Sequence, residues 1–185
     1  MNKKIYLIPV GKASSTSIEK LIEPLKEKFG FAVEIGKGID NIQFAYSKKR
    51  NQFHSSLILD ELKKYFPKDA AQILGIADVD LYVPSLNFVF GEAYSDSSVA
   101  IISLIRLREE FYGMMPSRTV FEKRMIKEAV HELGHCFKLG HCQNPACVMH
   151  FSNSLHDTDI KSPNFCSSCE EKLKIMLNNY RSKPK

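Results

Sequence analysis

The chain has 185 residues, of which 44% are hydrophobic, and a formal net charge of +5. This length and composition suffice for one substantial core, and no Pro-, Gly- or Ser-rich linker divides the chain. The basic stretches Lys48-Lys49-Arg50 and 181–185 lack interleaved aromatic residues, so the mild positive charge favours a solvated surface and no nucleic-acid partner.

The first elements in chain order predict strands that alternate with helices. Ile5 to Val10 reads as a strand, because Gly11 and Lys12 cut the apolar run too short for a signal peptide. Thr16-Ser17-Ile18-Glu19 has the form of a capping box. The helix that it opens has an apolar stripe of Ile18, Leu21, Ile22, Leu25 and Phe29, and we expect Pro24 to bend it. Phe31 to Ile35 forms the second predicted strand.

The middle of the chain continues the same alternation. We expect a helix from about Phe53 to Phe66, then strands near Gln72 to Ala77, Asn87 to Ala93 and Ser98 to Arg106. This order predicts the α/β fold class. No apolar stretch is long enough to cross a bilayer, so we expect no membrane partner and a cytoplasmic protein.

Two more capping boxes open the last predicted helices. Thr119-Val120-Phe121-Glu122 opens a helix that turns His131 and His135 toward a cleft. Its core face consists of Phe121, Met125, Ala129 and Leu133. Ser168-Cys169-Glu170-Glu171 opens the terminal helix, which packs on the body of the protein through Leu173, Met176, Leu177 and Tyr180.

The segment from His131 to Cys142 has the pattern of a catalytic metal site. His131 and His135 are four residues apart, so they share one helix face and can bind one cation. Glu132 lies beside the first ligand, where a carboxylate can act as a general base on a water molecule. His141, six residues after His135, supplies a third ligand and leaves one position open, which is typical of catalytic zinc. A chance match on a solvated helix is the alternative.

Four cysteines predict a second zinc site, with a structural role. They form one C-x4-C pair and one C-x2-C pair, which suits a closed tetrahedral site: Cys142, Cys147, Cys166 and Cys169. Two disulfides are the competing interpretation, but the cysteine count of five is odd and no secretory signal supports oxidation. The fifth cysteine, Cys136, is interpreted as a small packed residue.

These motifs together resemble the archaemetzincins, a branch of the metzincin zinc peptidases. The resemblance rests on His131, Glu132, His135, His141, Cys142, Cys147, Met149, Cys166 and Cys169, with further likeness from Ala45-Tyr46 to Gln52-Phe53 and from Leu86 to Ala93. It implies a zincin-like fold with a mixed twisted sheet, an active-site helix and a small C-terminal zinc knuckle. It also implies two zinc ions, one catalytic and one structural, and a Met-turn at Met149. The chain would then be one domain, 1–185, with a sheet and active-site helix in 1–138 and a four-cysteine subdomain in 139–185.

Lys138 departs from the metzincin pattern, which has glycine three residues after the second histidine. If Lys138 adopts a left-handed conformation, the strain is about 1 to 2 kcal/mol. Either that strain is tolerated, or the helix ends differently and Gly140 makes the turn. We expect His141 to remain a ligand in both cases.

The predicted function is hydrolysis of peptide bonds, with Glu132 as general base and a peptide or protein as substrate. The resemblance places Asn87 to Ala93 at the edge of the sheet, where its backbone can pair with an extended peptide, while Phe88 and Phe90 are equally well explained as core residues. Two alternatives remain: a zinc-stabilised peptide-binding module without catalysis, and a hydrolase of non-peptide amides. The sequence carries no signal for oligomeric state.

Overall fold

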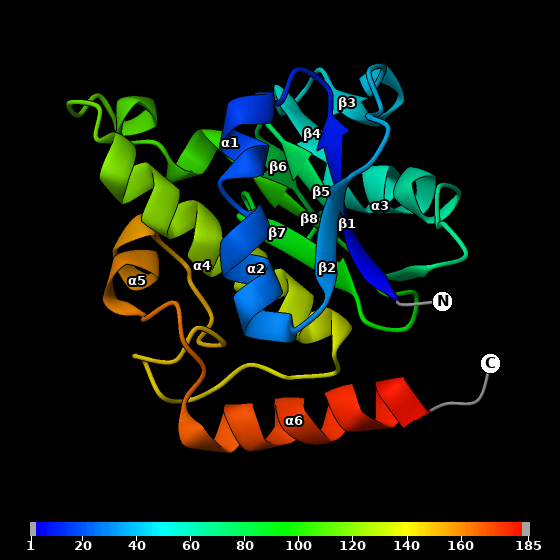
Figure 1. Cartoon of the computed structure of the whole chain (residues 1–185). Helices are drawn as coiled ribbons and strands as arrows, with labels where there is room; N and C mark the ends of the chain where they lie inside the picture. The colour runs from blue at the N-terminus through cyan, green and yellow to red at the C-terminus, as the bar shows by residue number, and fades with distance from the viewer. Residues whose placement is uncertain (1–2, 183–185) are drawn as a thin grey trace.

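A five-stranded mixed sheet forms the centre of the computed structural model, which describes residues 3–182 (Figure 1). The strand order is β2-β1-β5-β8-β7, with the bounds β1 Lys4–Val10, β2 Ala32–Ile35, β5 Ala70–Ala77, β7 Gly91–Tyr94 and β8 Val99–Ser103. The first four strands in this order are parallel, and β7 is antiparallel at the edge. All eight residues of β5 are buried, as expected for a central parallel strand that is covered on both faces. The predicted α/β class is confirmed.

Helices cover the two faces of the sheet unequally. One face packs against α1 (Ser15–Glu19), α2 (Ile22–Phe29) and α4 (Arg118–Cys136) in the larger core. The other face packs against α3 (Ser55–Lys63) in a smaller core. A separate three-stranded sheet has the strand order β3-β4-β6, with the bounds β3 Tyr46–Ser47, β4 Gln52–His54 and β6 Leu81–Tyr82. Strand β4 leads directly into α3. The described residues also form three short 3-10 helices, one before β3 at Gln43–Ala45 and two after β8 at Ile105–Leu107 and Glu109–Tyr112.

The chain after α4 runs through a long loop into α5 (Leu155–Ile160) and α6 (Ser167–Ser182). In Figure 1 this loop and α6 lie below α2 and the end of α4. Leu173 and Leu177 of α6 are buried in the larger core, and the Tyr180 hydroxyl donates to the Ala71 carbonyl. The predicted packing of the terminal helix on the body of the protein is therefore confirmed.

Pro24 breaks the first helix instead of bending it. The predicted single helix is two helices, and the break lies at Lys20 and Leu21. A proline ring clashes with the carbonyl four residues earlier, which here belongs to Lys20, so the chain restarts its helix at Ile22. The cap prediction at Thr16 was also wrong, because Ser14 occupies the N-cap and its side chain accepts no hydrogen bond.

Five other predicted boundaries need correction. Helix α6 already starts at Ser167, so the predicted box at Ser168 lies inside it. The residue that caps α4 is Ser117, whose hydroxyl accepts from the Val120 N–H, so the box at Thr119 lies inside the helix. The predicted strand from Asn87 is regular only over Gly91–Tyr94, and the predicted strand from Ser98 ends at Ser103. The predicted helix from Phe53 starts at Ser55, because Gln52–His54 pairs as β4. Helix α5 was not predicted, although Ser154 and Asp157 form a full capping box at its start.

No helix within residues 3–182 is long and apolar enough to cross a membrane. Most of the basic segment 181–185 falls outside the described residues.

Candidate active site and metal centres

His131, His135 and His141 converge at the C-terminal end of α4. The Nε2 atoms of His131 and His135 are 3.1 Å apart, and one ring nitrogen from each of the three histidines lies within 4.8 Å of the others. The centroid of the His141 ring is 5.4 Å from that of His131 and 4.7 Å from that of His135. The structure therefore brings together the three histidines that the sequence singled out, and their role as metal ligands stays a prediction.

Backbone carbonyls fix the tautomers of the two helical histidines. The Nδ1 of His131 lies 2.7 Å from the Val148 carbonyl, and that of His135 lies 2.8 Å from the Leu139 carbonyl. A carbonyl oxygen only accepts, so each Nδ1 carries the proton and donates it. Each Nε2 is left with a lone pair that faces the other histidine.

This donor set fits a zinc ion. Two imidazole lone pairs at this separation repel each other unless a cation lies between them. Zinc–nitrogen bonds of about 2.0–2.1 Å at a tetrahedral angle place two ligand nitrogens about 3.3 Å apart, close to the separation of the two Nε2 atoms. Burial also lowers the pKa of His131 well below its ordinary value and lowers the pKa of His135 and His141, which favours the neutral, ligating form of all three.

The turn after α4 brings His141 back to the helix. The Leu139 N–H donates to the Gly134 carbonyl and the Lys138 N–H donates to the His135 carbonyl, which together form a Schellman motif. Lys138 has a φ of 67° and so takes the left-handed position at which a metzincin has glycine. Of the two possibilities left open by the sequence, the structure shows Lys138 in the strained left-handed conformation. Gly140 does not make the turn.

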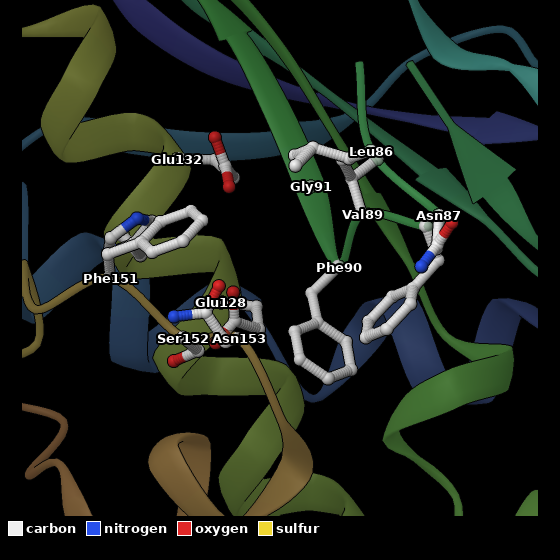
Figure 2. A pocket seen from close by; sticks show the side chains of 12 residues that line it. Leu86, Asn87, Val89, Phe90, Gly91, Glu128, Glu132, Phe151, Ser152 and Asn153 are labelled. Carbon is white, nitrogen blue, oxygen red and sulfur yellow. The ribbon is translucent and has the colours of Figure 1, made fainter. Parts of the chain in front are cut away.

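Glu132 is buried beside the histidines, against the edge strand. Its side chain is on α4 and faces Gly91 of β7, with only 5% of the residue exposed (Figure 2). Burial raises the pKa of Glu132 well above its ordinary value, and the nearby carboxylates of Glu128 and Glu92 add to this, whereas the Lys161 ammonium opposes it. A raised pKa suits a group that must both take and release a proton near neutral pH.

Gly91 is a functional residue that the sequence reasoning missed. A Cβ atom on Gly91 would lie 2.5 Å from Glu132 Oε1 and 2.6 Å from its Cγ, so only glycine leaves room for this carboxylate. The available signal was a glycine inside a predicted strand, which often marks a close approach by another group. Gly134 plays a similar part below the helix, because a Cβ there would lie 2.5 Å from Met149 Sδ.

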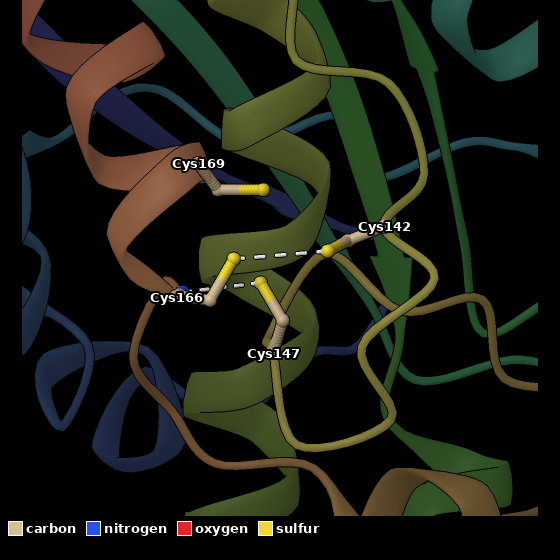
Figure 3. Close-up of side chains that lie close together, drawn as sticks. All are labelled: Cys142, Cys147, Cys166 and Cys169. Atoms are coloured by element: carbon tan, nitrogen blue, oxygen red, sulfur yellow. Dashed lines mark hydrogen bonds between the residues drawn. The ribbon is translucent and has the colours of Figure 1, made fainter.

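The four paired cysteines form a second cluster, between the loop after α4 and the start of α6 (Figure 3). Their Sγ atoms lie within 4.8 Å of one another, and those of Cys142 and Cys166 are 3.7 Å apart. Zinc–sulfur bonds of about 2.3 Å at a tetrahedral angle place two sulfurs about 3.8 Å apart, so this cluster fits a four-thiolate zinc site. All four cysteines are free thiols, so the structure contains neither of the alternative disulfides.

Local hydrogen bonds favour the thiolate form of Cys166, whereas burial raises the pKa of the Cys147 and Cys169 thiols. The Cys169 backbone N–H at the start of α6 lowers the pKa of the Cys166 thiol to about 7. The Cys166 N–H in turn donates to Cys147 Sγ, at 3.3 Å. Cys136 lies apart from the cluster and is buried, and burial raises the pKa of its thiol, as expected for a packed residue.

The two candidate metal centres are joined by one peptide bond, between His141 and Cys142. His150 donates from Nδ1 to the Cys142 carbonyl at 2.8 Å. The Cys142 N–H donates to the Met149 carbonyl. The backbone of Cys142 is thus held at both its N–H and its carbonyl by the segment that also packs Met149 below the helix.

The three histidines and Glu132 line a cleft of about 530 Å³. Its other wall includes Gly91, Glu92 and Ala93 of the edge strand β7. An extended peptide beside this strand would therefore pass over the histidines.

Comparison with known proteins identifies the family. A model of peptidase family M54 matches residues 40–175. The chain belongs to peptidase family M54. Among its M54 relatives, the archaemetzincin of Pyrococcus horikoshii is 49% identical over 155 residues, or 81% of each chain. The archaemetzincin of Pyrococcus furiosus is 44% identical over 184 residues, which cover 96% of this chain and 95% of the relative.

Solved structures agree with the M54 assignment. The archaemetzincin of Methanopyrus kandleri has a TM-score of 0.83 and 36% identity, and the match covers 96% of each chain. A zinc-dependent peptidase from Methanocorpusculum labreanum also has a TM-score of 0.83, with 31% identity over 91% of this chain and 99% of its own. The predicted resemblance to archaemetzincins, the zincin-like fold and the metallopeptidase class are confirmed.

Replacing Lys138 by glycine should stabilise the fold. Glycine takes a positive φ without a Cβ clash, so Lys138→Gly should raise the free energy of unfolding by about 1 kcal/mol in urea melts. The Lys138 ammonium also pairs with Asp96, so Asp96→Ala serves as the control for loss of that contact alone. A Lys138→Gly variant that is less stable than Asp96→Ala would contradict this account of the turn.

Adding a methyl group at Gly91 should displace the Glu132 carboxylate. Gly91→Ala should reduce kcat for peptide cleavage at least about tenfold, because Glu132 must leave its position, while zinc content stays unchanged. Gly140→Ala is the matched control, since a Cβ there meets no atom within 4 Å. Equal kcat values in the two variants would show that Glu132 does not depend on this gap.

Proposed function

We propose that this chain is a zinc-dependent metallopeptidase whose catalytic zinc is bound by His131, His135 and His141. The single observation that carries the proposal is the convergence of three imidazole nitrogens next to a buried carboxylate in a cleft bounded by an edge strand. Three protein ligands leave one coordination position for water or substrate. When bound, the zinc supplies Lewis acidity and makes a water molecule at the site more acidic.

Glu132 is the general base of the proposed reaction. Its carboxylate takes a proton from the attacking water, holds it while the peptide carbon becomes tetrahedral, and passes it to the leaving amine. The burial that raises the pKa of Glu132 makes its protonated form stable enough to exist between these two steps. The substrate backbone pairs with the edge strand β7, which holds the scissile bond over the histidines.

The second zinc of the proposal is structural and is bound by Cys142, Cys147, Cys166 and Cys169. Four thiolates leave no position for water. This metal ties the segment after α4 to the start of α6, and so holds the segment from which His141 emerges. We further propose that 1–185 is one domain, with 139–185 as its four-cysteine subdomain. The cytoplasmic location stays a prediction.

Replacing Glu132 by glutamine tests the reaction separately from metal binding. Glu132→Gln keeps the size of the side chain but removes the base, so kcat for peptide cleavage should fall by about 10²- to 10⁴-fold. Elemental analysis should still find two zinc ions per chain. Glu122→Gln, which lies on the outer part of the same helix, is the matched control and should keep full activity.

Three outcomes would contradict parts of the proposal. Full peptidase activity in Glu132→Gln would show that Glu132 is not the general base. A chain that binds peptides but does not cleave them would favour the binding-module alternative. A preference for small amides over extended peptides would favour a non-peptide amidase. One zinc per chain would contradict the two-metal assignment.

A further inference from the structure

A smaller cavity adjoins the cleft, and the proposed hydrolysis gives it no occupant. Its volume is about 170 Å³, and His131 is among its lining residues. It extends from Glu132 toward Glu128 and Ser152 (Figure 2). Gly91, His131 and Glu132 line both this cavity and the cleft, so the two spaces adjoin at these residues. A side chain next to the scissile bond can therefore enter the cavity.

The walls of the cavity suit an aromatic ring. Phe88 and Phe90 line one side, with ring centroids 5.1 Å apart and planes at 75°. Phe151, which is 39% exposed, lies at the boundary with the cleft, and its ring centroid is 4.9 Å from that of His141. An apolar protein cavity of about 150 Å³ binds benzene, so one ring fits a space of this size.

Polar groups lie among these aromatic walls. Glu128 is 2% exposed and lines the cavity together with Ser152. The Ser152 hydroxyl oxygen is buried and has no hydrogen-bond partner among the described residues. Buried hydroxyls are rarely left without a partner, so a ligand that brings a hydrogen-bonding group to Ser152 gains affinity.

The charge of Glu128 is already balanced inside the protein. Its Oε1 lies 2.9 Å from Lys161 Nζ, and the two residues are almost completely buried. A lysine or arginine side chain entering the cavity would bring a second cation close to Lys161, whereas a phenylalanine ring would leave Ser152 without a partner. A neutral phenol satisfies both constraints, since its hydroxyl can donate to Glu128 and accept from Ser152.

We propose that this cavity, walled by Phe88, Phe90 and Phe151 and carrying Glu128 and Ser152, binds a tyrosine side chain that flanks the scissile bond. The proposal rests on the proposed peptidase function, of which it specifies the substrate class. Ser152 is then a specificity-determining residue, because its hydroxyl distinguishes tyrosine from phenylalanine.

Binding of side-chain analogues tests the cavity without any turnover. The probes are p-cresol, toluene and n-butylamine, which stand for tyrosine, phenylalanine and lysine, titrated by NMR into the zinc-loaded Glu132→Gln full chain. We expect p-cresol to bind at least about tenfold more tightly than toluene, with shifts at Phe88 and Phe90. Ser152→Ala in the same background should reduce the ratio of the toluene Kd to the p-cresol Kd severalfold. Ser95→Ala, which removes a hydroxyl from the cleft lining and not from this cavity, should leave it unchanged.

Cleavage of a peptide series supplies the second measurement. Peptides that differ only in having tyrosine, phenylalanine, leucine or lysine on either side of the scissile bond should be ranked with tyrosine first, and Ser152→Ala should bring tyrosine and phenylalanine together. Toluene or n-butylamine binding as tightly as p-cresol would overturn the inference, as would equal cleavage of the tyrosine and phenylalanine peptides. Failure to cleave any peptide would instead contradict the proposed peptidase function, and the binding ratios would still decide the inference.

Discussion

The convergence of imidazole lone pairs on one point is the constraint on which the rest of this structure depends. Two carbonyls that accept from Nδ1 force the Nε2 atoms of His131 and His135 to face each other. Neither carbonyl belongs to α4: one is at Leu139 in the turn after the helix, and the other is at Val148 in the loop below. The geometry of the histidines therefore requires that the whole segment after α4 be correctly folded against it.

Three features hold that segment in place. The left-handed turn at Lys138 reverses the chain directly after the helix, at a cost in backbone strain. The four-cysteine cluster then connects this segment to α6. Metal binding contributes on the order of 10 kcal/mol in small zinc domains, which far exceeds the strain of one residue in a left-handed conformation.

A buried polar network provides the third support, from α5 and its surroundings. The Arg124 guanidinium binds the Asp159 carboxylate through two hydrogen bonds of 2.7 Å, and the Lys127 ammonium donates to the carbonyls of Thr158 and Asp159. Glu128, one helical turn after Arg124 on α4, pairs with Lys161. Removing one partner of such a buried pair leaves an uncompensated charge, so the network fixes how α5 sits on α4. The same network contributes Glu128 to the cavity beside the active site.

Local sequence spacing indicated which residues form the two candidate metal sites, but it did not indicate which side chains pack together in the tertiary structure. His131 and His135 share a helix face by the geometry of the helix, and the C-x2-C pair lies on one turn, so both could be recognised from the sequence. Family resemblance supplied the fold. Gly91 and Glu132, or Glu128 and Lys161, are brought together only by the tertiary structure, and no local pattern indicates such contacts. The break at Pro24 was misjudged because the apolar stripe continues across it, although the clash with the Lys20 carbonyl was foreseeable.

The most direct test of the central claim is a crystal structure of the zinc-loaded chain, with anomalous scattering measured on both sides of the zinc absorption edge. The account predicts two zinc peaks, one of them about 2.0–2.1 Å from a ring nitrogen of His131, His135 and His141, with a non-protein ligand on the side of Glu132. A zinc peak that His141 does not reach, or one whose fourth ligand is another side chain of the protein, would contradict it.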